Sequence, residues 1–445
     1  MTREPYPAYN ARMQTQALPG FRDFYPEDLA LRTYIFETWR TVATRYGFEE
    51  YDGPPLEPLD LYTTKSGDEI VGQLYNFTDK GDRAVALRPE MTPTLARMVA
   101  SQAGKLRKPI RWFSIPQLFR YERQQRGRLR EHFQLNCDLI GEPGPLGDAE
   151  LIALAVDIMR AFGLGPQDIR VRISDRRVLT AVLQGRGVPA SAMGKAFGFI
   201  DKVERLRKEQ IEEFSSRAEI FAPATVQDLT DVSSIRGWDQ LSQELGRSPE
   251  LSKAGEPLQE VRRSLEAMGL GDFIEPDLAI VRGLAYYTGV VFELFDAGRT
   301  LRAICGGGRY DDLLQAVGGV QLPAVGFGMG DVVLGELLRD KGRIPSDRSS
   351  IDVFLAFITR DEVPHVARLA HQLRDAGLRV EYALSPQPVG KQLKLADARK
   401  AKLAVVVGPD EWARGEVMMK DLRSGSQESV PTNSIVNTIK ARMHG

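Results

Sequence analysis

"FRYERQQRGRLREHFQ", residues 119–134, lies between two segments that are rich in aromatic and branched residues, 110–122 and 130–141. Both segments partly alternate between apolar and polar residues, as strands with one buried face do. We therefore predict a long antiparallel pair, with residues 123–128 as the loop between its strands. The first part of the chain should then be a largely antiparallel sheet that is interrupted by helices.

Positive charge is concentrated in this stretch, which holds five arginines within eleven residues. The whole chain is nearly neutral, with 59 Lys and Arg against 60 Asp and Glu. Arginine side chains bind phosphate groups through paired hydrogen bonds and stay charged at physiological pH. A polyphosphate, a nucleic acid or both would explain the cluster, and a solvated loop is the ordinary alternative.

Length and composition predict the number of domains and argue against a membrane, secreted or metal-binding protein. The chain has 445 residues, and at ~150 residues per domain this predicts about three domains. No run approaches the ~18 apolar residues of a membrane span, and the polar start argues against a secretory signal. Two cysteines, Cys137 and Cys305, and four histidines form neither a disulfide framework nor a metal-binding motif. We therefore expect a cytoplasmic protein with no membrane partner and no metal site of its own.

Helices and turns can be placed before the Arg-rich stretch. The spacing of apolar residues predicts a helix from Pro26 to Tyr46. Residues 74–90 have the pattern of a β-hairpin. A second helix should follow this hairpin, with Thr92 as its N-cap and Pro93 at its first position.

The composition and the secondary-structure pattern of the sequence change twice after this region. Charged helical segments dominate residues 176–271, which we interpret as a helical insertion. Strand-like sequence then returns, and the glycine-rich stretch from Gly326 suggests a turn into a helix. Beyond residue 350, strand and helix patterns alternate, which predicts a small, mostly parallel α/β domain. The predicted parts are a flexible N-terminal tail (1–17), a first domain (18–175 plus 272–340), the helical insertion (176–271) and a C-terminal domain (350–445).

Three stretches outside the hairpin carry residues that are suited to a ligand. Glu90 comes just before a predicted helix N-terminus, where anions are favoured and where a carboxylate could hold a substrate ammonium. Arg282 precedes the pair Tyr286-Tyr287, and the glycines 306–308 would let the backbone approach a flat ligand closely. The ordinary alternatives are a capped helix, core packing of a tyrosine and a simple turn.

The order and spacing of these stretches resemble the class II aminoacyl-tRNA synthetases. The sequences RGLAYYTG (282–289) and CGGGRYDDL (305–313) resemble histidyl-tRNA synthetases in particular, and the resemblance runs from about Leu18 to the end of the chain. It implies an α+β catalytic domain with the class II antiparallel sheet flanked by helices, a helical insertion, and a C-terminal α/β anticodon-binding domain. The helix 26–46 and Pro54 correspond to motif 1, which implies a homodimer.

The resemblance also implies an activity, a histidine–tRNA ligase that activates L-histidine with ATP and Mg²⁺ and transfers it to the 3′ end of tRNA(His). Arg120 would contact the α-phosphate and the histidine carboxylate, and Arg282 would stabilise charge on the α-phosphate during attack. The histidine-binding residues carried over are Glu90, Thr92, Arg120, Gln134, Asp138, Arg282, Tyr286 and Tyr287. The ATP-binding residues are Arg120, Glu122, Arg128, Gly308 and Arg309. Those at the hairpin tip that would meet the tRNA acceptor end are Arg123, Gln125 and Arg126.

The chain departs from the family at motif 3. Val332 and Val333 stand where the family usually has an acidic residue and an arginine that supports the γ-phosphate. The outer phosphates therefore lack their usual cation, and Arg309 and Arg128 are the candidates to replace it. Three further positions differ from residues that are frequent in the family, namely Ala285, Asp138 and Met91.

Two other functions are compatible with parts of this pattern. A non-catalytic paralogue, the regulatory subunit of ATP phosphoribosyltransferase, would explain the weakened ATP motifs. That paralogue generally lacks the C-terminal domain and loses the arginines that stand here as Arg120 and Arg282. An amino-acid-activating enzyme that uses no tRNA is a third interpretation. Five basic residues lie between Lys391 and Lys402, and they argue against this third interpretation because they could bind RNA phosphates. The ordinary alternative for them is a solvated helix face.

Overall fold

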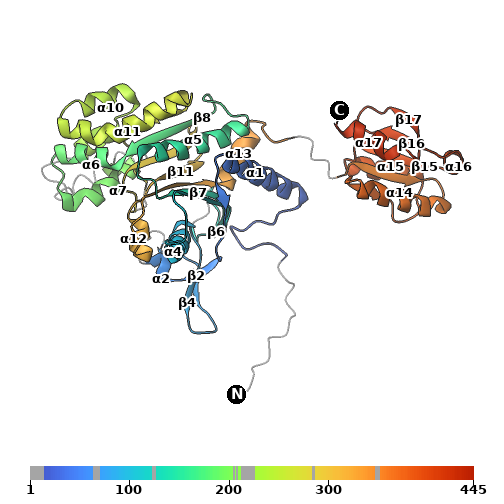
Figure 1. Cartoon of the computed structure of the whole chain (residues 1–445), viewed down its shortest axis with the longest axis horizontal. Helices are drawn as coiled ribbons and strands as arrows, with labels where there is room; N and C mark the ends of the chain where they lie inside the picture. The colour runs from blue at the N-terminus through green and yellow to red at the C-terminus, as the bar shows by residue number, and fades with distance from the viewer. Residues whose placement is uncertain are drawn as a thin grey trace, which may run out of the picture. The chain divides into compact units, whose positions relative to one another are not determined.

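The computed structural model describes residues 15–63, 71–122, 127–203, 206, 209–211, 226–282, 286–345 and 351–444. The chain divides into two compact units, Met1–Ile344 (unit 1) and Pro345–Gly445 (unit 2) (Figure 1). Each unit has a hydrophobic core of its own. None of the helices in the described ranges combines the length and the apolar character that a membrane crossing requires.

A nine-stranded sheet forms the centre of unit 1. Its strands are β1 (Glu49–Glu50), β5 (Ile110–Ser114), β6 (Gln117–Phe119), β7 (Glu131–Ile140), β8 (Ile169–Asp175), β9 (Ile274–Pro276), β10 (Val290–Asp296), β11 (Cys305–Arg309) and β12 (Ala324–Gly330). They follow the order β1-β5-β7-β12-β11-β10-β8-β9, with β6 paired to β7 off this path. The pairs β1–β5 and β8–β9 at the two ends are parallel, and the other pairs are antiparallel.

The antiparallel pair predicted around the Arg-rich stretch is confirmed. β5 and β6 both pair with β7, so that Trp112 lies opposite Asp138 and Leu118 lies opposite His132. Pro116 separates β5 from β6, because proline has no backbone N–H to donate to the ladder. The loop tip, residues 123–126, lies outside the described residues.

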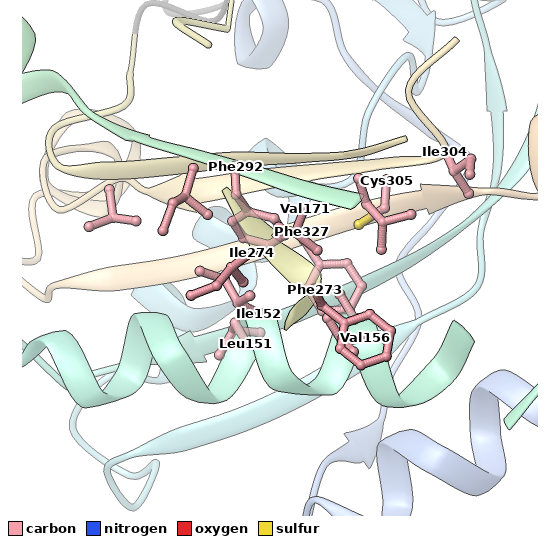
Figure 2. Packing of buried hydrophobic residues seen from close by; sticks show 14 of the residues in the cluster. Leu151, Ile152, Val156, Val171, Phe273, Ile274, Phe292, Ile304, Cys305 and Phe327 are labelled. Atoms are coloured by element: carbon pink, nitrogen blue, oxygen red, sulfur yellow. The ribbon is translucent and has the colours of Figure 1, made fainter. Parts of the chain in front are cut away.

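Helices pack a large core against one face of the sheet. α1 (Pro26–Arg45), which confirms the first predicted helix, packs there with α5 (Pro145–Ala161), α11 (Pro249–Ala267) and α13 (Asp331–Asp340). Figure 2 shows Leu151, Ile152 and Val156 of α5 close to Phe292 and Phe327 of the sheet. All five side chains belong to one buried cluster, so this face of the sheet holds structural residues.

The opposite face of the sheet carries a smaller core and leaves room for polar side chains. α4 (Thr92–Gln102) and α12 (Leu313–Gly318) pack there over Ile140 and Val291. Because side chains alternate along a strand, Gln134 and Asp138 share the face of Ile140, while Cys137 points to the α5 side. The alternation in β7 thus separates polar residues from the main core.

The remaining elements of unit 1 are shorter. A three-stranded sheet, β2 (Leu56–Pro58), β4 (Ala84–Leu87) and β3 (Asn76–Thr78), contains the predicted hairpin as β3–β4, and α2 (Asp60–Thr63) follows β2. Where residues 176–271 are described they are mainly helical, which agrees with the texture of their sequence. Their elements are α6 (Arg176–Gly185), η1 (Ala190–Ala192), α7 (Met193–Val203), α9 (Val226–Ser233), α10 (Gly237–Leu245), α11 and η3 (Gly271–Phe273).

Two local predictions for unit 1 are wrong. The helix α4 begins at Thr92, so Met91 and not Thr92 is its N-cap, and Pro93 is its second residue and not its first. The glycine-rich stretch from Gly326 to Gly330 forms strand β12 and is not a turn, although the helix predicted after it is present as α13. The glycines 306–308 likewise lie within β11. Pairing between two neighbouring strands overrode the turn tendency of glycine.

Unit 2 is a five-stranded sheet in the order β14-β13-β15-β16-β17. Its elements are β13 (Val353–Phe357), η4 (Arg360–Glu362), α14 (Val363–Asp375), β14 (Val380–Tyr382), α15 (Val389–Ala398), β15 (Leu403–Val407), α16 (Pro409–Ala413), β16 (Glu416–Asp421), β17 (Gln427–Pro431) and α17 (Ile435–His444). The expectation of a mostly parallel sheet is only half right, since β16 and β17 are antiparallel. The connection between these two strands is too short for the crossover that a parallel pair needs.

We predict that Gly318→Ala destabilises unit 1, because a Cβ on Gly318 would overlap the Cβ of Ala100 where α12 meets α4. Overpacking of this kind costs about 1–3 kcal/mol, which urea-induced unfolding would measure. In the double variant Ala100→Gly/Gly318→Ala the overlapping atom is absent, so most of the lost stability should return. A double variant no more stable than Gly318→Ala would contradict this packing.

Candidate active site

A pocket of about 750 Å³ opens on the α4 side of the sheet, which is the face opposite α5. Residues of the Arg-rich hairpin, of β10 to β12 and of the segment after β9 line it. We call it the arginine pocket, because five arginines converge on it: Arg120, Arg128, Arg282, Arg299 and Arg302. Such a concentration of guanidinium groups suits a polyphosphate.

Glycines on β11 and β12 form the floor of the arginine pocket. A Cβ on Gly306 would overlap the guanidinium of Arg282, and one on Gly328 would overlap the amide of Gln134. Gly326 in the same way leaves space for the carboxylate of Asp138. Large functional side chains can therefore lie flat against the sheet, since these positions carry no side chain of their own.

Arg282 is held firmly within the arginine pocket. Its φ angle is +59°, an unusual value for a residue other than glycine, and Arg176 Nη2 donates a 3.0 Å hydrogen bond to its carbonyl. The guanidinium lies 3.6 Å from the carboxylate of Glu293 and 5.6 Å from the centre of the Tyr287 ring. Backbone strain that the surroundings maintain is common at functional sites.

The base of the Arg-rich hairpin forms another wall of the arginine pocket. Arg120 Nε donates a 2.9 Å hydrogen bond to the carbonyl of Pro89. Arg128 forms an ion pair with the buried carboxylate of Glu122. The structure thus brings these three predicted ATP residues together, whereas Arg123, Gln125 and Arg126 lie outside the described residues.

Four of the residues predicted to bind the substrate histidine form, together with Tyr310, a second group beside the arginine pocket, which we call the tyrosine cluster. It consists of Tyr286, Tyr287 and Tyr310 with the buried carboxylates of Glu90 and Asp138. Tyr286 donates a 3.3 Å hydrogen bond to Glu90, and Tyr310 donates one of 2.5 Å to Asp138. Burial raises the pKa of Asp138 to about 7, although the bond from Tyr310 opposes this shift.

Thr92 and Gln134 complete the set predicted for histidine. Thr92 is the first residue of α4, two positions after Glu90, and Gln134 lies on β7 in the wall of the arginine pocket. Tyr310 was not predicted. It follows the CGGGR sequence directly, and its role depends on a contact with Asp138, 172 residues away in the chain.

Gly308 and Arg309, predicted to bind ATP, are not brought to the wall of the arginine pocket. Gly308 lies beneath the ring of Tyr287. Arg309 is buried, and its guanidinium lies 2.8 Å from Asp148 of α5 and donates to the carbonyl of Glu142. Its hydrogen-bonding groups thus tie β11 to α5, which is a structural role.

The sequence analysis also missed a network of hydrogen bonds and ion pairs between the base of the hairpin, the N-terminal segment and α13. Arg22 donates to Glu131 at 2.6 Å and to Asp331 at 2.9 Å. Asp331 in turn accepts a hydrogen bond from the backbone N–H of Phe133. Arg22 thus joins the N-terminal segment to β7 and to the start of α13, and no local pattern in the sequence identifies these partners.

His132 faces the arginine pocket from β7 and was also not predicted. Burial lowers its pKa to about 3, and the positive charges of Arg120, Arg22 and Arg128 act in the same direction. The imidazole is therefore neutral at physiological pH and adds no charge to the pocket.

In unit 2 the predicted basic patch lies on α15 and just after it. Lys391 and Lys394 are exposed. Arg399 lies 3.4 Å from Glu381 and Lys402 lies 3.7 Å from Asp352, so acidic partners offset part of the positive charge.

Comparison with protein families gives two matches. A model described as histidyl-tRNA synthetase matches residues 20–330, and a model described as an anticodon binding domain matches residues 352–442. The first range holds the tyrosine cluster and the residues that line the arginine pocket except Val332 and Val333, and the second spans most of unit 2.

Individual relatives give the same picture. The histidine–tRNA ligase of Opitutus terrae is 46% identical over 426 residues, which cover 94% of this chain and 97% of the relative. The chloroplastic/mitochondrial histidine–tRNA ligase of Arabidopsis thaliana is 39% identical over 430 residues, which cover 96% of this chain and 87% of the relative.

Solved structures agree in fold. The histidyl-tRNA synthetase of Nostoc sp. PCC 7120 superposes with a TM-score of 0.83 at 28% identity, over 97% of this chain and 100% of that one. A second structure, from Bacillus halodurans C, is described as an ATP phosphoribosyltransferase regulatory subunit/histidyl-tRNA synthetase. It superposes with a TM-score of 0.72 at 22% identity, over 89% of this chain and 99% of that one. The second likeness concerns the fold alone.

We predict that His132 makes the stability of the protein depend on pH. The unfolded chain binds a proton at this residue below about pH 6.5, whereas the folded protein does so only near pH 3, so acid favours unfolding. Between pH 7 and pH 5 the free energy of unfolding should fall by up to about 2 kcal/mol more in the wild type than in His132→Gln. Urea-induced unfolding at both pH values would measure this difference. The control His371→Gln, at an exposed position, should behave as the wild type does, and an unchanged pH dependence in His132→Gln would contradict the prediction.

Proposed function

This chain belongs to the histidyl-tRNA synthetase family and is an enzyme that joins histidine to tRNA with ATP as a substrate, and we propose that the arginine pocket performs the activation step. The observation that carries this proposal is the presence of Arg120 and Arg282 in one pocket, next to the tyrosine cluster. Guanidinium groups suit the phosphates of ATP, and the carboxylates and rings of the cluster suit an amino acid with an ammonium group and an imidazole.

In the activation step a carboxylate oxygen of histidine attacks the α-phosphorus of ATP. A new bond forms between this oxygen and phosphorus, the bond to the bridging oxygen breaks, and pyrophosphate leaves with the electron pair. Two anions meet in this step, so fixed cations must offset their repulsion and the charge that develops. Arg120 and Arg282 take this role, because preorganised charges stabilise a transition state without rearranging during the reaction. The substrate supplies the nucleophile, so no nucleophilic side chain is needed.

The tyrosine cluster would bind the histidine substrate. Glu90 and Asp138, with Thr92 and Gln134 beside them, would receive the ammonium group, and the rings of Tyr286 and Tyr287 would surround the imidazole. An ammonium group next to Asp138 would favour the ionised carboxylate and so oppose the effect of burial on its pKa.

At the base of the hairpin, Glu122 and Arg128 would hold ATP. Magnesium would enter as part of the ATP substrate, with phosphates and water as most of its ligands. The carboxylates of Glu122 and Glu293 in the arginine pocket are both engaged with arginines, which fits an ion that is bound mainly by the substrate.

The second step would pass histidine to the 3′ end of tRNA(His). Arg123, Gln125 and Arg126 of the hairpin tip would meet the acceptor end. Unit 2 would bind the anticodon, with the exposed Lys391 and Lys394 near RNA phosphates. The hairpin would then serve two polyanions, ATP at its base and tRNA at its tip.

The ligase activity is favoured over the regulatory subunit of ATP phosphoribosyltransferase. Relatives that cover nearly the whole chain at 46% and 39% identity are histidine–tRNA ligases. The anticodon-binding model matches unit 2, and Arg120 and Arg282 both line the arginine pocket.

We also propose a homodimer in the cytoplasm. α1 buries Ile35 and Trp39, but exposed Leu29 and the preceding Tyr25 give its start an apolar surface. Both cysteines are free, as a reducing compartment allows. Analytical ultracentrifugation should give twice the mass of the chain, and Leu29→Glu should lower it. A wild type that sediments with the mass of one chain would exclude the dimer.

Histidine-dependent exchange of pyrophosphate into ATP tests the proposed activation step. The wild type should catalyse this exchange with histidine and not with other amino acids. Arg282→Ala should reduce the rate by about 10²–10³-fold, because a fixed cation at the α-phosphate is lost. The control Arg263→Ala removes an exposed arginine of α11 and should leave the rate unchanged.

Two outcomes would contradict the proposal. A wild type that binds histidine but does not exchange pyrophosphate would favour the regulatory function. An Arg282→Ala variant with the wild-type rate would remove Arg282 from the activation step.

A further inference from the structure

The segment between β10 and β11 carries two arginines that no role above uses. Arg299 and Arg302 are exposed and line the arginine pocket, together with Arg120, Arg128 and Arg282. Their segment joins β10 to β11, whereas the hairpin base belongs to β7, and β12 lies between β11 and β7.

Arg302 lies next to the base of the hairpin. A Cβ placed on Gly127 would be 3.3 Å from Val333 Cγ2 and 3.9 Å from Arg302 Cδ. Val333 and the stem of the Arg302 side chain therefore flank the same point, one residue before Arg128. At this point α13 offers only the methyl groups of a valine, whereas the segment before β11 offers the cation of Arg302.

The inner arginines already have carboxylate neighbours. Arg128 is paired with Glu122, and Arg282 lies 3.6 Å from Glu293, so each positive charge is partly offset before a ligand binds. A triphosphate spreads its charge over several groups, and the outer ones need a donor of their own. An arginine is suited to this, since its guanidinium offers paired donors to phosphate oxygens.

Arg302 fits this need better than Arg299. The guanidinium of Arg299 lies 5.2 Å from the centre of the Phe295 ring, and that ring belongs to the core under α4. Arg299 thus lies over the far end of β10, whereas Arg302 lies beside Gly127 at the hairpin base.

We propose that Arg302 binds the outer phosphates of ATP, at the place where Val333 provides no charge. The proposal rests on the proposed function and deepens it, since it names the residue that holds the leaving pyrophosphate. It adds Arg302 to Arg128 as a residue for these phosphates, whereas Arg309 pairs with Asp148 of α5 and does not line the arginine pocket.

Pyrophosphate exchange with the full-length chain, measured at varied ATP and varied histidine, tests this assignment. Arg302→Ala should raise the KM for ATP by about tenfold or more, because a charge-assisted hydrogen bond is lost, while the KM for histidine changes less than about threefold. Arg302→Lys keeps the charge but lacks the paired donors, so its KM for ATP should lie between that of the wild type and that of Arg302→Ala. Arg299→Ala removes an equal charge from the same segment and should have a clearly smaller effect on the KM for ATP.

A second variant tests the position directly. In Arg302→Ala/Val333→Arg a new arginine stands beside Gly127, and the KM for ATP should fall back toward the wild-type value. Because Val333 is buried, thermal unfolding must show that this variant is folded; if it is not, the comparison of Arg302→Ala with Arg299→Ala decides.

The outcomes that overturn the proposal are distinct. A wild-type KM for ATP in Arg302→Ala would exclude Arg302, and an equal or larger effect of Arg299→Ala would show that only the total charge matters. A wild type without any exchange would contradict the proposed function instead.

Discussion

The pairing of β12 with β7 and β11 is the constraint on which the candidate active site depends. Backbone hydrogen bonds between these strands place Gly326, Gly328 and Gly306 on the pocket side of the sheet. Asp138, Gln134 and Arg282 lie over these glycines, where a Cβ would overlap them. The same strands carry bulky side chains such as Phe327 on the α5 side, so one sheet serves as a core on one face and as a binding surface on the other.

Charge in the arginine pocket is organised in pairs. Arg128 is matched with Glu122 and Arg282 with Glu293, and Arg22 is matched with Glu131 and Asp331 behind the hairpin. A buried charge is costly unless it has a partner, so these carboxylates allow arginines to stay in place before any substrate is bound. The contacts of Arg22 and Asp331 also join the N-terminal segment to β7 and to α13.

Arg309 and Arg302 show how a motif and its use can differ. Arg309 follows three glycines and is part of the sequence that most resembles the family, yet it ties β11 to Asp148 of α5. Arg302 lies three residues before Cys305 in a stretch with no recognisable pattern, yet it lines the pocket beside Gly127. A residue within a motif can serve the fold that carries the site, while a residue outside the motif lines the pocket.

The sequence by itself determined the antiparallel pair around the Arg-rich stretch, the helix 26–46 and the helical character of residues 176–271, because the periodicity of apolar residues reflects local backbone structure. It also determined the family, through the order and spacing of its motifs. Through the family resemblance it also named five of the residues that line the pocket, Arg120, Glu122, Arg128, Gln134 and Arg282. Only the tertiary structure decided that glycines of β11 and β12 form strands, that Tyr310 bonds to Asp138, and that His132 is neutral. These properties depend on strand register and on burial, which bring together residues that are not neighbours in the chain, and Tyr310 and Asp138 are even 172 residues apart, so no local pattern encodes such contacts.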